Sequence, residues 1–256
     1  IVEAPVMPQT RQLAYDVIKK QTGEEFFGKR IGHFADQSFY GVGLTSIFGT
    51  FSEQDIEKTR DILAFRPIPT KKSGGLGWWW HTEHDTLDKV DEAFLIRDTK
   101  IYLATIWRIL TSPVLPYDMT EAVSEMQDTV RSLQEDLGER FDLSKLSNRL
   151  DALKDRVCAF YEDAETIAEP GEKADVINET IQALSRTIVR ITFHGNNHFG
   201  FDLSGAMFPI QSLVDGTRLA TCSLGSYRYY VLETQFRRGY NRVMAHLKEA
   251  LSYFPE

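Results

Sequence analysis

Three long stretches beyond residue 113 carry apolar residues at intervals of three and four, which is the strongest constraint on how this chain can fold. That spacing gives each predicted helix one apolar stripe. The stripes are Val123, Met126, Val130, Leu133 and Leu137; Leu143, Leu146, Leu150, Leu153 and Val157; and Ile177, Ile181, Leu184, Ile188 and Ile191. Gly138 and the Pro170-Gly171 pair lie where helical hairpins turn. The pattern predicts a helical bundle.

A fourth helix is predicted over residues 217–254. One face of this helix carries Leu232, Phe236, Tyr240, Val243 and Leu247. Breakers interrupt every apolar repeat, so the spacing favours a bundle over a long coiled coil.

The first 112 residues have a mixed pattern. A helix is expected from Pro8 to Thr22 with Gly23 as its stop, and Leu44–Phe51 is an apolar, β-branched run typical of a buried strand. Ser52 is expected to cap a helix running to about Ala64, and Asp91 to cap another over Glu92–Thr111.

Pro113 and Pro116 end the predicted helix Glu92–Thr111. They predict a domain boundary, with residues 1–112 forming an α/β domain and residues 113–256 a helical one.

Composition and charge exclude several classes of partner. The 37 Asp and Glu outnumber the 29 Lys and Arg, and no basic block stands out, which disfavours nucleic acid. No apolar run approaches the roughly 20 residues of a membrane helix, so no membrane segment is expected. Cys158 and Cys222 have no metal-ligand spacing and leave the localisation unknown. The chain starts with Ile1, which indicates a piece of something longer.

Residues 74–91, GGLGWWWHTEHDTLDKVD, are the candidate site. Glycines let backbone approach a ligand, and the tryptophans supply an apolar wall. His81 has three possible roles at this point: a metal ligand, a general acid or base, or a histidine packed on Trp80 without chemistry. His84 is three residues further on, but a short loop rarely aims two rings at one ion.

The order His81-Thr82-x-x-Asp85-Thr86-Leu87-Asp88-Lys89-Val90-Asp91, after a glycine-rich aromatic loop and before a long helix, resembles the last metal-binding segment of the two-zinc exopeptidases. That family includes aminopeptidases, glutamate carboxypeptidase and the non-catalytic transferrin receptor. The resemblance implies that His81 binds one zinc ion. Trp80 stands where the family often has a carbonyl-polarising tyrosine; without a hydroxyl, it is expected to shape the substrate pocket.

A second resemblance covers residues 33–46, in which Asp36 matches an acid on the substrate side of the family's cleft. Asp36 is therefore expected either to contact substrate or to cap the short helix that follows it. The Glu24-Glu25 pair resembles the family's general-base motif, but Asp36 follows Glu25 by only 11 positions. No strand and further ligand fit in between, so the pair is interpreted as a solvated turn.

Together these matches imply an α/β plus α protein: the C-terminal portion of a three-layer zinc-exopeptidase domain, followed by a helical domain like the family's dimerisation domain. The whole protein would hydrolyse peptide substrates with a two-zinc site. One imidazole cannot hold a catalytic zinc, so this chain alone is expected to be inactive. The alternative is a non-catalytic binding or dimerisation module of the transferrin receptor type. A purely structural helical scaffold is the third possibility.

The expected homodimer would use aromatic and arginine side chains on the last helix, although the same side chains could pack inside the bundle. They are Tyr227, Arg228, Tyr229, Tyr230, Phe236, Arg237, Arg238 and Tyr240. His194 and His198 flank an irregular connection and either bind a metal or hydrogen-bond that connection. Asn178-Glu179-Thr180 matches the glycosylation triplet within a helical pattern.

Overall fold

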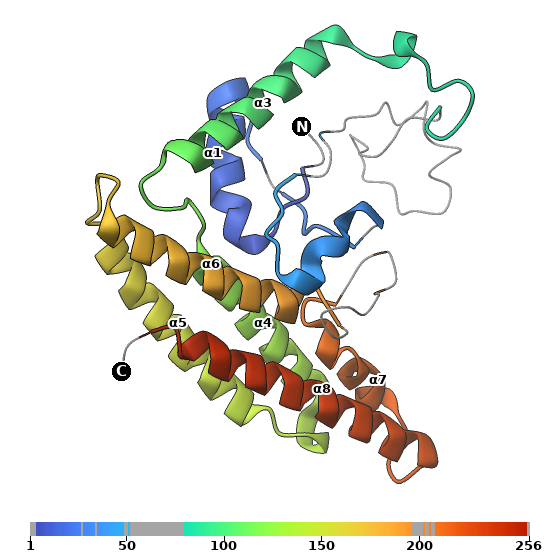
Figure 1. Ribbon diagram of the computed structural model, residues 1–256. Helices are drawn as coiled ribbons and strands as arrows, with labels where there is room; N and C mark the ends of the chain where they lie inside the picture. The colour runs from blue at the N-terminus through green and yellow to red at the C-terminus, as the bar shows by residue number, and fades with distance from the viewer. Residues whose placement is uncertain are drawn as a thin grey trace. The chain divides into compact units, whose positions relative to one another are not determined.

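The computed structural model describes residues 4–26, 28–33, 35–48, 51, 79–195, 202, 205 and 208–254, with the side chains of residues 35–38 left out. The contacts divide the chain into two units (Figure 1). Unit 1 is Ile1–Ile31 with Ser46–Ser112, and unit 2 is Gly32–Thr45 with Pro113–Glu256. One break therefore follows Ser112, and the segment Gly32–Thr45 groups with the helical unit.

The predicted α/β architecture is wrong: the described residues form seven α-helices and no strand or sheet. The β-type contacts among them are isolated bridges, in which Val6 pairs with Arg30 and with Ile47, and His33 with Gly205. Of the predicted strand Leu44–Phe51, residues 44–48 and 51 are described, and only Ile47 forms a bridge.

The sequence around Val6 explains why its bridges do not extend into a ladder. Pro5 lacks an N–H group, and Pro8 opens the short 3-10 helix η1 (Pro8–Thr10). The stretch between these two prolines is therefore too short for Val6 to be part of a ladder of consecutive pairs, and it pairs with little more than one residue on each of its two edges. An apolar β-branched run cannot form a sheet without a neighbour that offers consecutive backbone groups.

Unit 1 is built on α1 (Arg11–Thr22) and α3 (Glu92–Thr111), which pack against each other. The predicted stop of the first helix and the predicted cap of the second are confirmed, but α1 begins at Arg11 and not at Pro8, because Pro8–Thr10 form η1. Gly23 closes α1 in the left-handed conformation at φ 74°, and the Asp91 side chain caps α3 by accepting a hydrogen bond from the Phe94 N–H. The small core between them includes Leu13, Ala14, Val17, Ile18 and Ile101.

Unit 2 is the predicted bundle. Its first helices are α4 (Met119–Leu137), α5 (Ser144–Ala164) and α6 (Glu172–Thr192). The predicted stripes are buried except for Ile177 of α6, which is half-buried. The predicted fourth helix is divided into α7 (Asp215–Thr221) and α8 (Tyr227–Leu251). The division has a local cause, because Gly225 has a φ of 74° and the Ser226 hydroxyl caps α8 by accepting from the Tyr229 N–H.

The segment Gly32–Thr45 carries the 3-10 helix η2 (Ala35–Val42), which packs on α6 of the same unit. Tyr40 is buried edge-on between His33 and Phe193, and the Thr45 and Ser185 hydroxyls are hydrogen-bonded. Gly43 has a φ of 80°, and a Cβ there would lie 2.4 Å from the Arg186 carbonyl oxygen. A glycine is therefore required where this segment meets α6.

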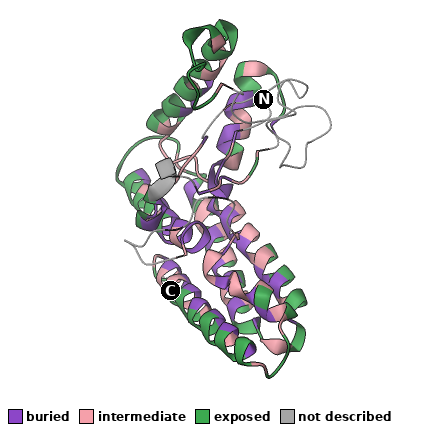
Figure 2. Cartoon of the chain, turned by 90° about the vertical axis from the view of Figure 1, so that its right-hand side faces the viewer, coloured by how far each residue is buried: buried purple, intermediate pink, exposed green. Residues whose placement is uncertain are grey.

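Helix α3 differs from the bundle helices because it is apolar on two sides. Only Ile101 and Thr105 are buried in it (Figure 2). The opposite side, the α3 outer face, consists of exposed Leu95, Ile96, Leu103, Ile106, Trp107 and Leu110. Helices that are apolar all round are usually covered on all sides. Among the described helices, none combines the length and the apolar character needed to cross a bilayer.

Candidate metal-binding segment

His81 lies in an exposed turn of unit 1 that precedes α3. The Thr82 hydroxyl donates to the Trp79 carbonyl oxygen at 2.7 Å and accepts from the His84 N–H at 3.2 Å. These bonds close the turn. The 3-10 helix η3 (Leu87–Lys89) then leads to Asp91, the cap of α3.

The backbone of His81 is strained. Its φ is 62°, and Phe48 is the other non-glycine residue with a positive φ in the described part of the chain. This conformation costs of order 1–3 kcal/mol and is found most often at functional sites. It turns the imidazole back onto Trp80, where the two rings stack with centroids 3.7 Å apart and planes at 21°. Trp80 is 47% exposed and His81 is exposed, so both rings face outward.

The outward position of His81 bears on its three possible roles. The stacking on Trp80 is the packing that the third role describes, while the exposure of the ring also leaves it open to a ligand. Nevertheless, the described residues contain no group of three or more His, Cys, Asp or Glu side chains that could hold a metal ion. Zinc in a catalytic site normally takes three protein ligands. One imidazole does not meet that requirement, so the described residues by themselves do not fit a zinc ion.

The other sequence-predicted site residues fall elsewhere. Asp36 lies in η2, in unit 2, and its side chain is outside the described residues, so its predicted substrate contact stays a prediction. His84 is exposed, with its Nε2 3.9 Å from a Glu83 carboxylate oxygen. Glu24 and Glu25 are exposed after α1, as expected for a solvated turn.

His194 is part of a hydrogen-bonded connection, as one of the two interpretations predicted. Its Nδ1 lies 2.7 Å from Asp202 Oδ2, and both side chains are buried. The same carboxylate oxygen accepts from the Gly195 N–H at 2.9 Å. His198 lies outside the described residues.

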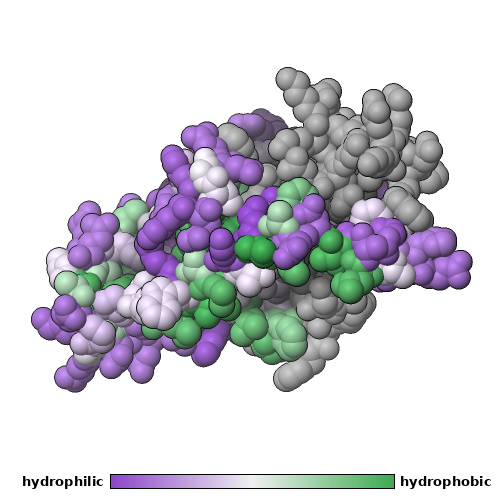
Figure 3. Space-filling view, turned by 90° about the horizontal axis from the view of Figure 1, so that it is seen from above, coloured by the Kyte–Doolittle hydropathy of each residue, from purple (hydrophilic) through white to green (hydrophobic). Residues whose placement is uncertain are grey.

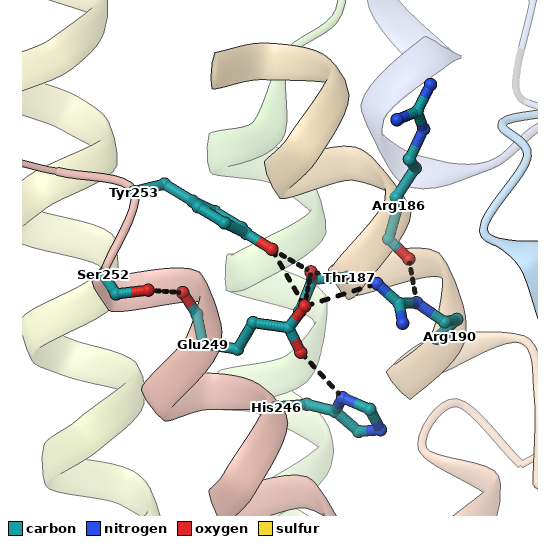
Figure 4. Close-up of polar contacts among 7 residues, drawn as sticks. All are labelled: Arg186, Thr187, Arg190, His246, Glu249, Ser252 and Tyr253. Atoms are coloured by element: carbon teal, nitrogen blue, oxygen red, sulfur yellow. Dashed lines mark hydrogen bonds and ion pairs between the residues drawn. The ribbon is translucent and has the colours of Figure 1, made fainter. Parts of the chain in front are cut away.

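Sequence reasoning missed a polar cluster between α6 and α8 (Figure 4). Glu249 is at its centre: one carboxylate oxygen accepts from the Tyr253 hydroxyl at 3.0 Å and lies 3.5 Å from the Arg190 guanidinium, and the other lies 3.4 Å from His246 Nδ1. Thr187, fully buried on α6, lies 3.0 Å from the Tyr253 hydroxyl. The sequence signal that could have revealed this cluster is the spacing of His246, Glu249 and Tyr253 by three and four residues. The cluster ties the last turns of α8 to α6.

This cluster predicts an acid-sensitive contribution to stability. Partial burial acts to raise the pKa of the Glu249 carboxyl, but hydrogen bonds from Tyr253 and His246 and the charge of Arg190 outweigh it, so the pKa lies below its ordinary 4.5. A carboxyl with a lowered folded-state pKa stabilises the fold above pH 4.5, and this contribution is lost as pH falls through the folded value. Because the side chain is 41% exposed, we expect at most about 1 kcal/mol.

Urea unfolding between pH 7 and pH 3 measures this effect. Glu249→Gln should flatten the loss of stability below about pH 4.5 relative to the unchanged protein. The matched control is Glu135→Gln on the exposed side of α4, which should leave the curve unchanged. Equal acid sensitivity with and without Glu249 would contradict the assignment.

Comparison of the chain with models of known protein families and with curated proteins gives no match.

Proposed function

We propose that this chain is the C-terminal part of a two-zinc exopeptidase, to which it contributes His81 as one zinc ligand and unit 2 as a dimerisation domain. The observation that carries the proposal is the His81 turn. A histidine within a segment that resembles the family's last metal-binding motif is exposed, has a φ of 62°, and lies in a turn closed by the hydrogen bond from the Thr82 hydroxyl to the Trp79 carbonyl oxygen. A positive φ at a non-glycine residue is one of the features that cluster at functional sites, which supports a role for His81 in addition to its stacking on Trp80.

The α3 outer face supports the same proposal. Leu87 and Val90, between the His81 turn and α3, are exposed, as are Leu95 and Ile96 on α3. The view from above shows apolar patches among hydrophilic ones on the surface of the described residues (Figure 3). Large contiguous apolar patches on soluble proteins mark surfaces that another polypeptide covers. In the proposed enzyme, the polypeptide that carries the remaining zinc ligands covers this face.

The homodimer is proposed to use the exposed side of α8. Tyr227 is 87% exposed, Tyr230 58% and Val231 38%. Tyr230 and Val231 line a shallow depression of about 360 Å³ together with Thr234, Gln235 and Arg238. Tyrosine and arginine are enriched at the cores of protein interfaces. This surface is also the observation that favours the alternative, a non-catalytic binding or dimerisation module.

The decisive experiment uses the longer protein that the proposal requires, assayed for zinc content and for release of terminal amino acids from peptides. His81→Ala should lower activity by at least about 100-fold, because even residues that only support a ligand contribute about 10–100-fold, and should lower the bound zinc. The control is His84→Ala, which should change neither quantity.

Two results would overturn the proposal. Full zinc content and activity in the His81→Ala protein would remove His81 from the site. A long protein that dimerises but neither binds zinc nor cleaves peptides would establish the non-catalytic module. For the chain itself, calorimetric titration should give no tight stoichiometric zinc binding.

A further inference from the structure

The segment Pro113–Asp118, which leads into α4, is held on unit 2 by side chains from two other helices. Asn178 of α6 contacts the segment at two points: its Oδ1 accepts from the Leu115 N–H at 2.8 Å, and its Nδ2 donates to the Pro113 carbonyl oxygen at 2.9 Å. An asparagine side chain has the same donor and acceptor as a peptide group, so it pairs with this backbone as a neighbouring strand would.

Tyr161 of α5 holds the other end of the segment. Its hydroxyl donates to the Tyr117 carbonyl oxygen and accepts from the Met119 N–H at 3.3 Å. Burial raises the pKa of the Tyr161 hydroxyl, with a further increase from the charge of Asp118, although the Met119 hydrogen bond opposes it. The hydroxyl therefore keeps its proton and stays a donor.

The composition of the segment makes these contacts necessary. Pro113 and Pro116 have no N–H, and every residue from Pro113 to Asp118 is half-buried without belonging to a helix. Half-buried backbone groups outside regular structure need partners from side chains or water. Asn178 and Tyr161 supply four such bonds at Pro113, Leu115, Tyr117 and Met119.

We propose that Asn178 and Tyr161 form a strap that fixes Pro113–Asp118 to unit 2, and that Asn178 serves this purpose instead of carrying a glycan. The Asn178-Glu179-Thr180 triplet matches the glycosylation motif, but the sugar would attach to Nδ2, the atom that donates to Pro113. This inference stands independently of the proposed peptidase function.

Limited proteolysis of the native chain, with the cut sites mapped by mass spectrometry, tests the strap. Asn178→Ala removes both contacts, and Asn178→Asp places a carboxylate oxygen against the Pro113 carbonyl oxygen. Both should increase cleavage within residues 113–118 about tenfold, because proteolysis follows local opening. Tyr161→Phe keeps the ring and loses the hydroxyl, so it should increase cleavage there as well.

The matched control is Thr180→Ala, which destroys the glycosylation triplet and leaves both strap contacts intact. Its cleavage rate should equal that of the unchanged chain. The proposal is overturned if Asn178→Asp and Tyr161→Phe are cut no faster than the unchanged chain, or if Thr180→Ala is cut as fast as Asn178→Asp.

Two measurements on the unchanged chain remain decisive should the variants fail to fold. The Leu115 N–H should exchange with solvent at least tenfold more slowly than in an unstructured peptide, and unprotected exchange would contradict the strap. When the chain is produced in a secretory eukaryotic host, folded material should carry no glycan on Asn178. A glycan on protease-resistant, folded protein would overturn the second half of the proposal.

Discussion

Replacing Gly239 with alanine should destabilise unit 2 by about 3 kcal/mol or more, although alanine is the better helix former. Gly239 lies in the interior of α8, where α8 meets the 3-10 helix η5 (Gln211–Leu213). A Cβ at this position would lie 1.8 Å from the Ser212 carbonyl oxygen. Backbone cannot rotate away as a flexible side chain can, so α8 and η5 must separate to admit the methyl group.

The expected loss of stability is opposite in sign to the usual effect of the same substitution within a helix, so the measurement gives a clear answer. At an open position within a helix, glycine to alanine stabilises by up to about 1 kcal/mol. Urea unfolding monitored by circular dichroism measures the difference, and Asn241→Ala, exposed on the same helix, is the control that should change stability by less than about 0.5 kcal/mol. If Gly239→Ala unfolds at a higher urea concentration than the unchanged protein, the close approach of α8 and η5 is wrong.

Phe236→Ala should cost about 3–5 kcal/mol of unfolding free energy. The ring is fully buried and packs edge-on against Phe141, with centroids 4.8 Å apart. It also fills the space beside Gly216, where a Cβ would lie 2.7 Å from the ring. The alanine would leave a cavity among these neighbours that the surrounding helices can only partly fill.

Tyr230→Ala is the matched partner on the same helix, because Tyr230 is 58% exposed. It should change the unfolding free energy by less than about 1 kcal/mol. In sedimentation velocity, by contrast, Tyr230→Ala should shift the proposed homodimer toward monomer. Equal unfolding midpoints for the two variants would contradict the burial of Phe236, and an unchanged sedimentation coefficient would contradict the α8 interface.

The burial of Tyr229 and Phe236 decides between the two interpretations of the aromatic cluster for these residues: they pack inside the bundle. The sequence grouped Tyr229 and Phe236 with Tyr227 and Tyr230 as one aromatic cluster. In the structure, Tyr229 is 9% exposed and Phe236 fully buried, so both belong to the core of unit 2. Helical spacing had already placed Phe236 on the apolar face with Leu232 and Val243, whereas composition alone grouped it with the exposed tyrosines of the same helix.

The helices of unit 2 could be predicted because their determinants are local. Apolar stripes spaced by three and four, with breakers at Gly138 and Pro170-Gly171, are sufficient to define α4, α5 and α6. The caps of α1 and α3 follow equally local rules, since Gly23 tolerates a left-handed φ and the Asp91 carboxylate satisfies a free N–H.

The errors concern contacts between distant parts of the chain. Leu44–Phe51 has the composition of a strand, but a strand exists only where a neighbour offers its backbone, and Val6 offers single pairs. The Glu249 cluster and the strap of Asn178 and Tyr161 join segments more than 40 positions apart, so no short window of sequence contains either of them.

For the candidate site, the sequence alone singled out His81 and Trp80 through residue types and order. Packing of His81 on Trp80 was one of the three predicted roles and is observed, whereas the exposed position and the φ of 62° became evident only in the structure. Local patterns determine where a helix starts, where it ends and which stripe is apolar, because those properties depend on neighbours within a few residues. Which stripe is buried, and which side chain remains exposed for chemistry, depends on the surfaces that the tertiary structure brings together.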